Sequence, residues 1–208
     1  MSRFSLIPFW RYPLLFCLFS GVLLLLASCS QNTTAGQTST QAGGTSTQGC
    51  DIEVSWAVGY GSLKELKQAR VLDLTVQGTF TAIQSTQGQA SPSGQNNLLS
   101  TDFTFLISKV LLDPHHFLKD SYSKITIHQT GGSIGNTLHQ VCGDPLFGIG
   151  EEAILFLQQL SPGHYFVMGG PSGRFDVRKG LVQPINDEGV KLPQGATEQQ
   201  FYTLLSAA

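Results

Sequence analysis

The sequence predicts a mainly β fold, a small closed or partly closed β-barrel with one short helix before it and one helix after it. Short segments of alternating apolar and polar residues recur between turns rich in glycine, proline and serine, which is typical of barrel strands. Between these segments there is no amphipathic helix long enough to form a crossover connection. This pattern argues against a doubly wound α/β sheet.

The first predicted element is a short helix. Ser62, followed three residues later by Glu65, has the spacing of a capping box at a helix N-terminus. The helix is expected to continue through about Gln68, with Leu63 and Leu66 on its buried edge.

Two strands are predicted next, with a loop between them. Residues 71–83 alternate apolar and polar side chains, and Gly78 within them indicates a bulge or bend. Residues 84–100 are polar and rich in glycine and serine, so we expect a long loop. Residues 102–112 form the second predicted strand.

The later strand patterns are short and end at turn residues. They lie at residues 124–129, 137–141, 151–160, 164–168, 174–177 and 181–185. Gly131-Gly132-Ser133 is expected to end the first of them. Residues 151–160 are the most apolar, as expected for a strand covered on both faces. The last three are expected to form a meander, with residues 178–180 as its hairpin turn.

A second helix is predicted at residues 197–206. Thr197 and Gln200 have the spacing of another capping box. Phe201, Leu204 and Leu205 form the expected apolar stripe.

The N-terminus carries a targeting signal. An apolar run at residues 14–27 follows two arginines and ends at Ala27-Ser28, just before Cys29. The run is shorter than the roughly 20 apolar residues that a spanning helix needs, which favours a cleaved signal. This ending resembles the lipobox of bacterial lipoproteins. An ordinary secretory signal and an uncleaved anchor are the alternatives.

The lipobox resemblance implies a location. Residues 1–28 would be the signal peptide, and Cys29 would become the acylated first residue of a protein held on the extracytoplasmic face of the cell membrane. Residues 29–49 are polar, uncharged and rich in Ser, Thr, Gly and Gln, so they are expected to be a disordered tether. The β-barrel domain is expected to span residues 50–208.

Charge argues against a nucleic-acid partner. The chain has 12 Lys and Arg against 14 Asp and Glu, and two of the basic residues, Arg3 and Arg11, lie in the signal. The mature chain therefore has a formal charge of −4. A nucleic-acid footprint needs a clustered basic face instead.

Four cysteines have three expected fates. Cys17 leaves with the signal, and Cys29 is assigned to lipid. Cys50 and Cys142 are then left in an oxidising compartment, where a disulfide is the simplest outcome. Two free thiols are the alternative.

The order of elements resembles that of the netrin-like domain, the OB-type barrel shared with the tissue inhibitors of metalloproteinases. The matching pieces are Cys50, residues 63–69, 71–80 and 104–111, Val141-Cys142-Gly143 and residues 151–160. The resemblance implies a small OB-like barrel, and it implies a bridge between Cys50 and Cys142.

One departure from that family concerns its chemistry. The inhibitors chelate a protease zinc with the free amino group of their first cysteine. Cys50 follows a long tether, so its nitrogen is an amide without a free lone pair. The resemblance therefore does not extend to metalloprotease inhibition.

Two reactive clusters are weaker alternatives. His115 and His116, with Asp113 and Asp120, have ligand types that suit zinc, but a solvated turn is the preferred interpretation. Cys142 with His139 would form a thiol–imidazole pair, against which stands the expected disulfide.

Aromatic residues offer a further possibility. Tyr165, Phe166 and Phe175 are either packed core residues, the preferred interpretation, or an exposed platform for a ligand.

The sequence therefore favours a lipid-anchored extracytoplasmic binding module, not an enzyme, without a metal or cofactor. Its expected contacts are the membrane, through lipid on Cys29, and an envelope or extracellular protein or polymer met by the loop at residues 84–100. The alternative is an extracytoplasmic enzyme that uses the Cys142/His139 pair or a His115/His116 metal site.

Overall fold

A computed structural model describes residues 50–208 of the chain, except 57, 90–97, 119–122 and 188. All of these belong to one compact unit. In chain order its helices and strands are α1 (Leu63–Gln68), β1 (Leu74–Gln89), β2 (Leu98–Leu112), β3 (Lys124–Ile134), β4 (Thr137–Gln140), β5 (Glu152–Ser161), β6 (His164–Val167), the 3-10 helix η1 (Gly170–Gly173), β7 (Arg174–Arg178), β8 (Leu181–Pro184) and α2 (Glu198–Ala207).

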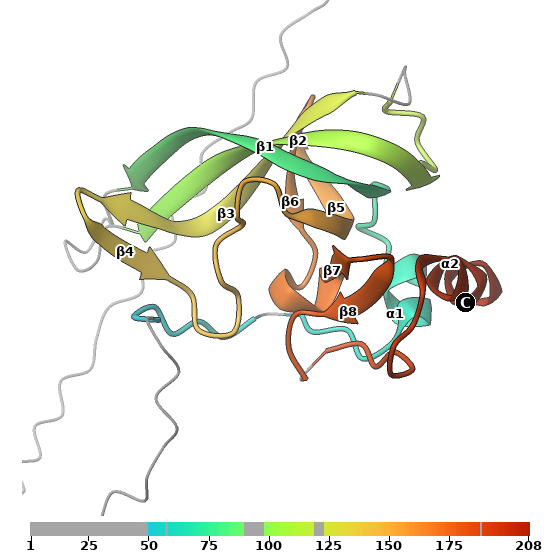
Figure 1. Ribbon diagram of the computed structural model, residues 1–208. Coiled ribbons are helices and arrows are strands. Elements are labelled where there is room, and N and C mark those ends of the chain that lie inside the picture. Colours follow the sequence, from blue (N-terminus) through green and yellow to red (C-terminus); the bar gives the residue numbers. More distant parts are fainter. Residues whose placement is uncertain (1–49, 57, 90–97, 119–122, 188) are drawn as a thin grey trace, which may run out of the picture. The chain divides into compact units, whose positions relative to one another are not determined.

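Five strands close into a barrel (Figure 1). Their order is β1-β2-β3-β6-β5, and antiparallel pairing of β5 with β1 completes the ring. Within the ring, β3 and β6 are parallel and the other neighbours are antiparallel. The predicted small OB-like barrel with a helix at each end is thereby confirmed.

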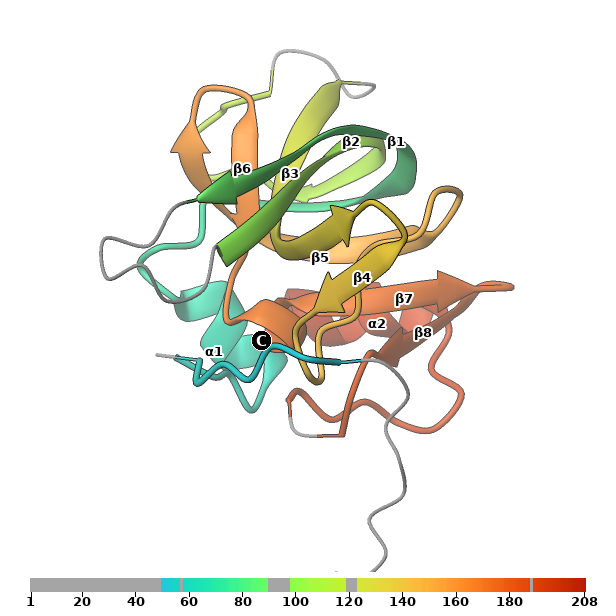
Figure 2. The same ribbon diagram turned by 90° about the vertical axis from the view of Figure 1, so that its left-hand side faces the viewer.

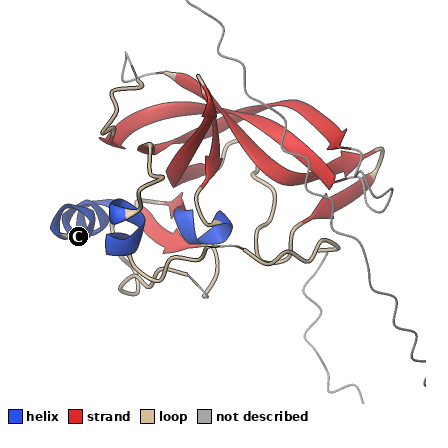
Figure 3. Ribbon diagram, turned by 180° about the vertical axis from the view of Figure 1, so that it is seen from behind, coloured by secondary structure: helices blue, strands red, loops and turns tan. Residues whose placement is uncertain are grey.

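Two hydrophobic cores lie on opposite faces of β5. Leu155 and Leu157 point into the barrel, whereas Ile154 and Phe156 point into a second core. Helices α1 and α2 and strands β7 and β8 cover that second core, and Figure 3 shows the helices on one side of the long barrel strands. Burial on both faces confirms the prediction made from the apolar run at residues 151–160.

Both helices begin as predicted. The Ser62 side chain accepts from the Glu65 backbone N–H, and Thr197 and Gln200 form a reciprocal capping box. Phe201 and Leu205 are buried. Leu204 is 39% exposed, so its place in the predicted apolar stripe is wrong: the packed face of α2 is formed by Phe201, Tyr202 and Leu205.

The prediction of a loop over residues 84–100 is wrong at both ends of this range, which belong to strands. Strand β1 continues to Gln89 and pairs with β2, which begins at Leu98. Polar side chains match across this pair, as in the hydrogen bond from Ser85 Oγ to Asp102 Oδ2 at 3.2 Å. Cross-strand polar pairs stabilise a solvent-facing ribbon that has no apolar alternation. The centre of the expected loop lies outside the described residues.

The glycine pair in β3 does not end that strand. Strand β3 continues to Ile134 and pairs with β4. A β-carbon at Gly132 would lie 2.6 Å from Thr101 Oγ1, so glycine is needed there to let β3 approach the neighbouring strands closely.

The predicted meander is wrong in its pairing. Strand β7 pairs with β8 as expected, but on its other side it pairs with β5 and not with β6. The reason is that β6 is already paired on both sides, with β3 and β5.

A disulfide fixes the start of the domain. Cys50 and Cys142 are bonded, with Cα atoms 4.9 Å apart, as predicted. Ile52 forms a parallel bridge with Val141, and Figure 2 shows this blue-green segment passing below β4 toward α1. The first residues of the domain, Cys50 to Ile52, are thereby held beside Val141 and Cys142.

Cys29 and the predicted signal and tether lie outside the described residues. In the part of the chain that the structure describes, no helix has the length and apolar character needed to cross a bilayer.

Candidate binding groove around Trp56

Two aromatic rings, one of them an exposed tryptophan, lie against two consecutive glycines. Trp56 is 40% exposed, and its ring lies against Gly170, where a β-carbon would come within 2.4 Å of the indole. The ring of Tyr60 lies in the same way against Gly169. Both glycines have positive φ, a conformation that glycine adopts without strain. The turn before β7 is thus shaped to receive two aromatic rings.

Two hollows share Trp56 as part of their walls. Each has a volume of about 300 Å³, and both are also lined by Phe166, Val167 and Gly170. The first hollow is mainly apolar, and its other lining residues are Val58, Tyr60, Val71, Gln158, Met168 and Gly169. The second is mixed, and its other lining residues are His128, Gln129, Thr130, Asp144, Phe147 and Leu160. We call the two hollows together the Trp56 groove.

Three neighbouring strands place side chains in this groove. Phe166 of β6 lies opposite His128 of β3 on one side and opposite Gln158 of β5 on the other. Residues opposite one another on paired strands point to the same face of a sheet. The groove therefore contains a row of polar, aromatic and polar side chains on the outer face of the barrel.

The His128 ring is oriented by a carboxylate. Its Nδ1 lies 2.7 Å from Asp102 Oδ1, and Ser85 donates to the other oxygen of that carboxylate. The Asp102 oxygen accepts a hydrogen bond from Nδ1–H, so Nε2 is the ring nitrogen that does not contact the carboxylate.

Asp144 supplies a buried carboxylate beside the second hollow. It is 6% exposed, and burial raises its pKa above the usual range of an aspartate. The Arg174 guanidinium, 3.7 Å away, and a hydrogen bond with Gln129 oppose that rise. Arg174 also donates to Pro145 O and Glu151, so it ties this loop to β7.

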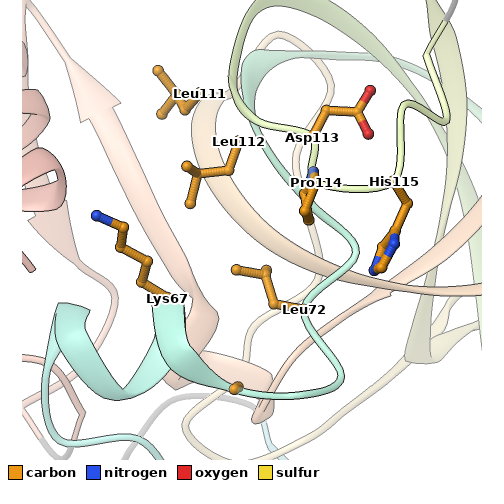
Figure 4. A pocket seen from close by; sticks show the side chains of 8 residues that line it. Lys67, Leu72, Leu111, Leu112, Asp113, Pro114 and His115 are labelled. Carbon is orange, nitrogen blue, oxygen red and sulfur yellow. The ribbon is translucent and has the colours of Figure 1, made fainter.

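A larger hollow of about 510 Å³ lies elsewhere, between α1 and the end of β2 (Figure 4). Its charged groups already have partners. Lys67 Nζ donates to the carbonyl groups of Leu205 and Ser206, and Asp113 accepts from two backbone N–H groups. His115 lies 3.6 Å from Asp73. These groups hold the fold together, so the Trp56 groove is the better candidate.

The structure divides the predicted aromatic set. Tyr165 and Phe175 are 1% and 0% exposed, which confirms the preferred core interpretation for them. Phe166 instead lines the groove. Trp56 was not among the predicted site residues, although apolar residues alternate from Ile52 to Tyr60, a pattern that indicates an extended segment.

The two reactive clusters are not assembled. Cys142 is in the disulfide, and His139 Nδ1 is hydrogen-bonded to Asp51. His115 contacts Asp73 and the ring of Phe117, and Asp120 lies outside the described residues. Among the residues that the structure describes, no three His, Cys, Asp or Glu side chains lie close enough to hold a metal ion.

Comparison with known proteins adds no relative. No protein-family model matches the chain, and searches of curated proteins and of solved structures find no significant match.

Proposed function

We propose that the protein is a lipid-anchored binding module on the extracytoplasmic face of a bacterial cell membrane. Its barrel would hold an envelope or extracellular polymer or protein in the Trp56 groove, while lipid on Cys29 keeps it at the membrane. A single acyl chain binds a bilayer only marginally, so stable anchoring of this kind needs more than one.

One observation carries the binding role. Trp56 remains 40% exposed although its ring is fixed against Gly170, with an open hollow on each side. Exposed tryptophan is typical of binding hot spots, because a rigid aromatic ring gives a large contact area at little entropic cost.

The enzyme alternative has less support. A thiol in a disulfide cannot act as a nucleophile, and Cys142 is bonded to Cys50. The bonded Cys142 is thus not available for thiol chemistry.

The anchor is tested by metabolic labelling. Cells expressing the full chain are grown with an alkyne analogue of palmitate, and the purified protein is probed for the label. We expect label in the wild type and in Cys17→Ser, and none in Cys29→Ser. Equal labelling of Cys29→Ser would contradict the anchor.

The binding role is tested by sedimentation. Detergent-solubilised full chain is mixed with insoluble envelope material from its host cell and centrifuged. Wild type should sediment, and Trp56→Ala should lose about tenfold or more in affinity, as for a hot-spot residue. Phe117→Ala is the matched control, because Phe117 is also 40% exposed but lies outside the groove. Equal sedimentation of all three proteins would contradict a site at Trp56.

A further inference from the structure

We infer that the ligand of the Trp56 groove is an uncharged glycan chain, with neighbouring sugar rings seated on either side of Trp56. The inference rests on the proposed function and names its ligand class. It follows from which groups line the groove, which of them are free to bind, and how the charges there are compensated.

The aromatic rings suit the faces of sugars. Trp56 and Phe166 line both hollows and are each only partly buried. The face of a pyranose ring presents C–H groups, which pack against the negative face of an aromatic ring. One ring shared by two hollows thus offers contact to two successive units of a chain.

Hydrogen-bonding groups beside these rings are free. Neither the side chain of Gln158 nor that of Thr130 is hydrogen-bonded to another described residue, and the same holds for Nε2 of His128. The Gln158 amide supplies both a donor and an acceptor, the Thr130 hydroxyl does the same, and Nε2 adds a further hydrogen-bonding atom. Such a mixed set matches hydroxyl groups, each of which can both donate and accept.

The spacing of these groups suits an extended ligand. Gln158, Phe166 and His128 lie in register on three adjacent strands, and adjacent strands are about 5 Å apart. A chain laid across the strands therefore meets an amide, an aromatic ring and an imidazole in turn.

Charge in the groove argues against a polyanion. Among its described lining residues there is no lysine or arginine. Asp144 lies beside the Arg174 guanidinium, and the carboxylate of Asp102 is hydrogen-bonded to His128. Nucleic acids and sulfated glycans require several cationic contacts, so an uncharged polymer fits better.

The backbone argues against a peptide that adds as a strand. Strand β6 forms the floor of the groove, and its two edges are already paired with β3 and β5. Strand addition needs an unpaired edge. Recognition in the groove must therefore come from side chains, as it does for sugars.

The test extends the sedimentation assay with full-length protein in detergent. The envelope material is first digested exhaustively with protease, and binding is then challenged with glycol chitin, hydroxyethylcellulose, galactomannan or heparin. Digestion should leave sedimentation intact for the wild type and Phe117→Ala. At least one uncharged polysaccharide should compete, and heparin should not. Trp56→Ala should lower the affinity in this assay about tenfold or more, and Gln158→Ala should lower it severalfold.

Three results separate the two claims. Loss of Trp56-dependent sedimentation after protease would overturn the glycan inference and leave the binding module standing with a protein ligand. Competition by heparin alone would overturn it in favour of a polyanion. If wild type and Trp56→Ala do not differ even on undigested envelope material, the proposed function itself fails.

Discussion

The indole of Trp56 lies directly against the backbone of Gly170, so closely that a β-carbon on the glycine would meet the ring at 2.4 Å. This contact joins the segment that follows the disulfide to the turn before β7. It also gives the protein an internal reporter, because the only other tryptophan, Trp10, lies in the predicted signal.

Replacing Gly170 should move this ring. Gly170→Ala adds a β-carbon against Trp56 at a residue with φ of 53°, so we expect a shift in tryptophan emission and a loss of about 1–2 kcal/mol in unfolding free energy. Gly195→Ala is the control, since Gly195 also has positive φ but no neighbour within 4 Å of the added carbon. It should lose stability with unchanged emission. An emission shift of equal size in both variants would mean that the shift does not arise from the contact between Trp56 and Gly170.

Arg174 should be essential for stability. Its side chain is 3% exposed and lies near the carboxylates of Asp144, Glu151 and Asp176. Arg174→Met leaves the buried carboxylate of Asp144 without its cation, so we expect a loss of about 3–5 kcal/mol in unfolding free energy, measured by chemical denaturation.

The matched control for that loss is Arg178→Met. Arg178 also pairs with Asp176, at 3.0 Å, but its side chain is 71% exposed. Exposed ion pairs contribute at most about 1 kcal/mol. A similar small loss for Arg174→Met would show that the buried network is not needed.

Asp144 should give stability a distinct pH dependence. Burial raises its pKa above the unfolded value of 3.8, so between these two pKa values the folded state holds more protons than the unfolded state. Unfolding free energy from this group therefore falls as pH rises through that window. Asp144→Asn removes this pH dependence. The unfolding free energy of the variant minus that of the wild type should therefore increase from pH 4 upward. A difference that decreases over this range would contradict the raised pKa.

The disulfide should stabilise the whole domain. It joins residues 92 positions apart, and a disulfide typically contributes about 2–4 kcal/mol. The double variant Cys50→Ser/Cys142→Ser should have a free energy of unfolding that is lower by that amount. It should therefore unfold at a lower denaturant concentration. Reductant should destabilise the wild type but not the variant. Alkylation of both thiols in unreduced wild type would show that the bridge is absent.

Local patterns predicted much of this fold because its elements are set by nearby residues. The capping pairs at Ser62 and Thr197 placed both helices, and alternation placed most strands. The extension of β1 to Gln89 was not predictable from alternation, because cross-strand polar pairs stabilise it. Likewise, Gly132 looked like a strand break until β1 and β2 were found packed against it.

The Trp56 groove could not be predicted in the same way. Trp56, His128, Phe166 and Gly170 meet only after the barrel closes and the disulfide fixes the N-terminal segment. The burial of Arg174 could not be predicted from the sequence either, because arginine is rarely buried unless it is paired. Its partners come from a loop and from β7, and their meeting depends on the complete fold.

The most direct test of the central claim measures how accessible Trp56 is to a quencher. Tryptophan emission of the full chain, in a Trp10→Phe background, is titrated with acrylamide before and after binding to soluble fragments of host envelope material. If the groove holds the ligand, binding should shield the partly exposed indole and lower the quenching constant severalfold. Binding with unchanged quenching would place the ligand elsewhere and contradict the account.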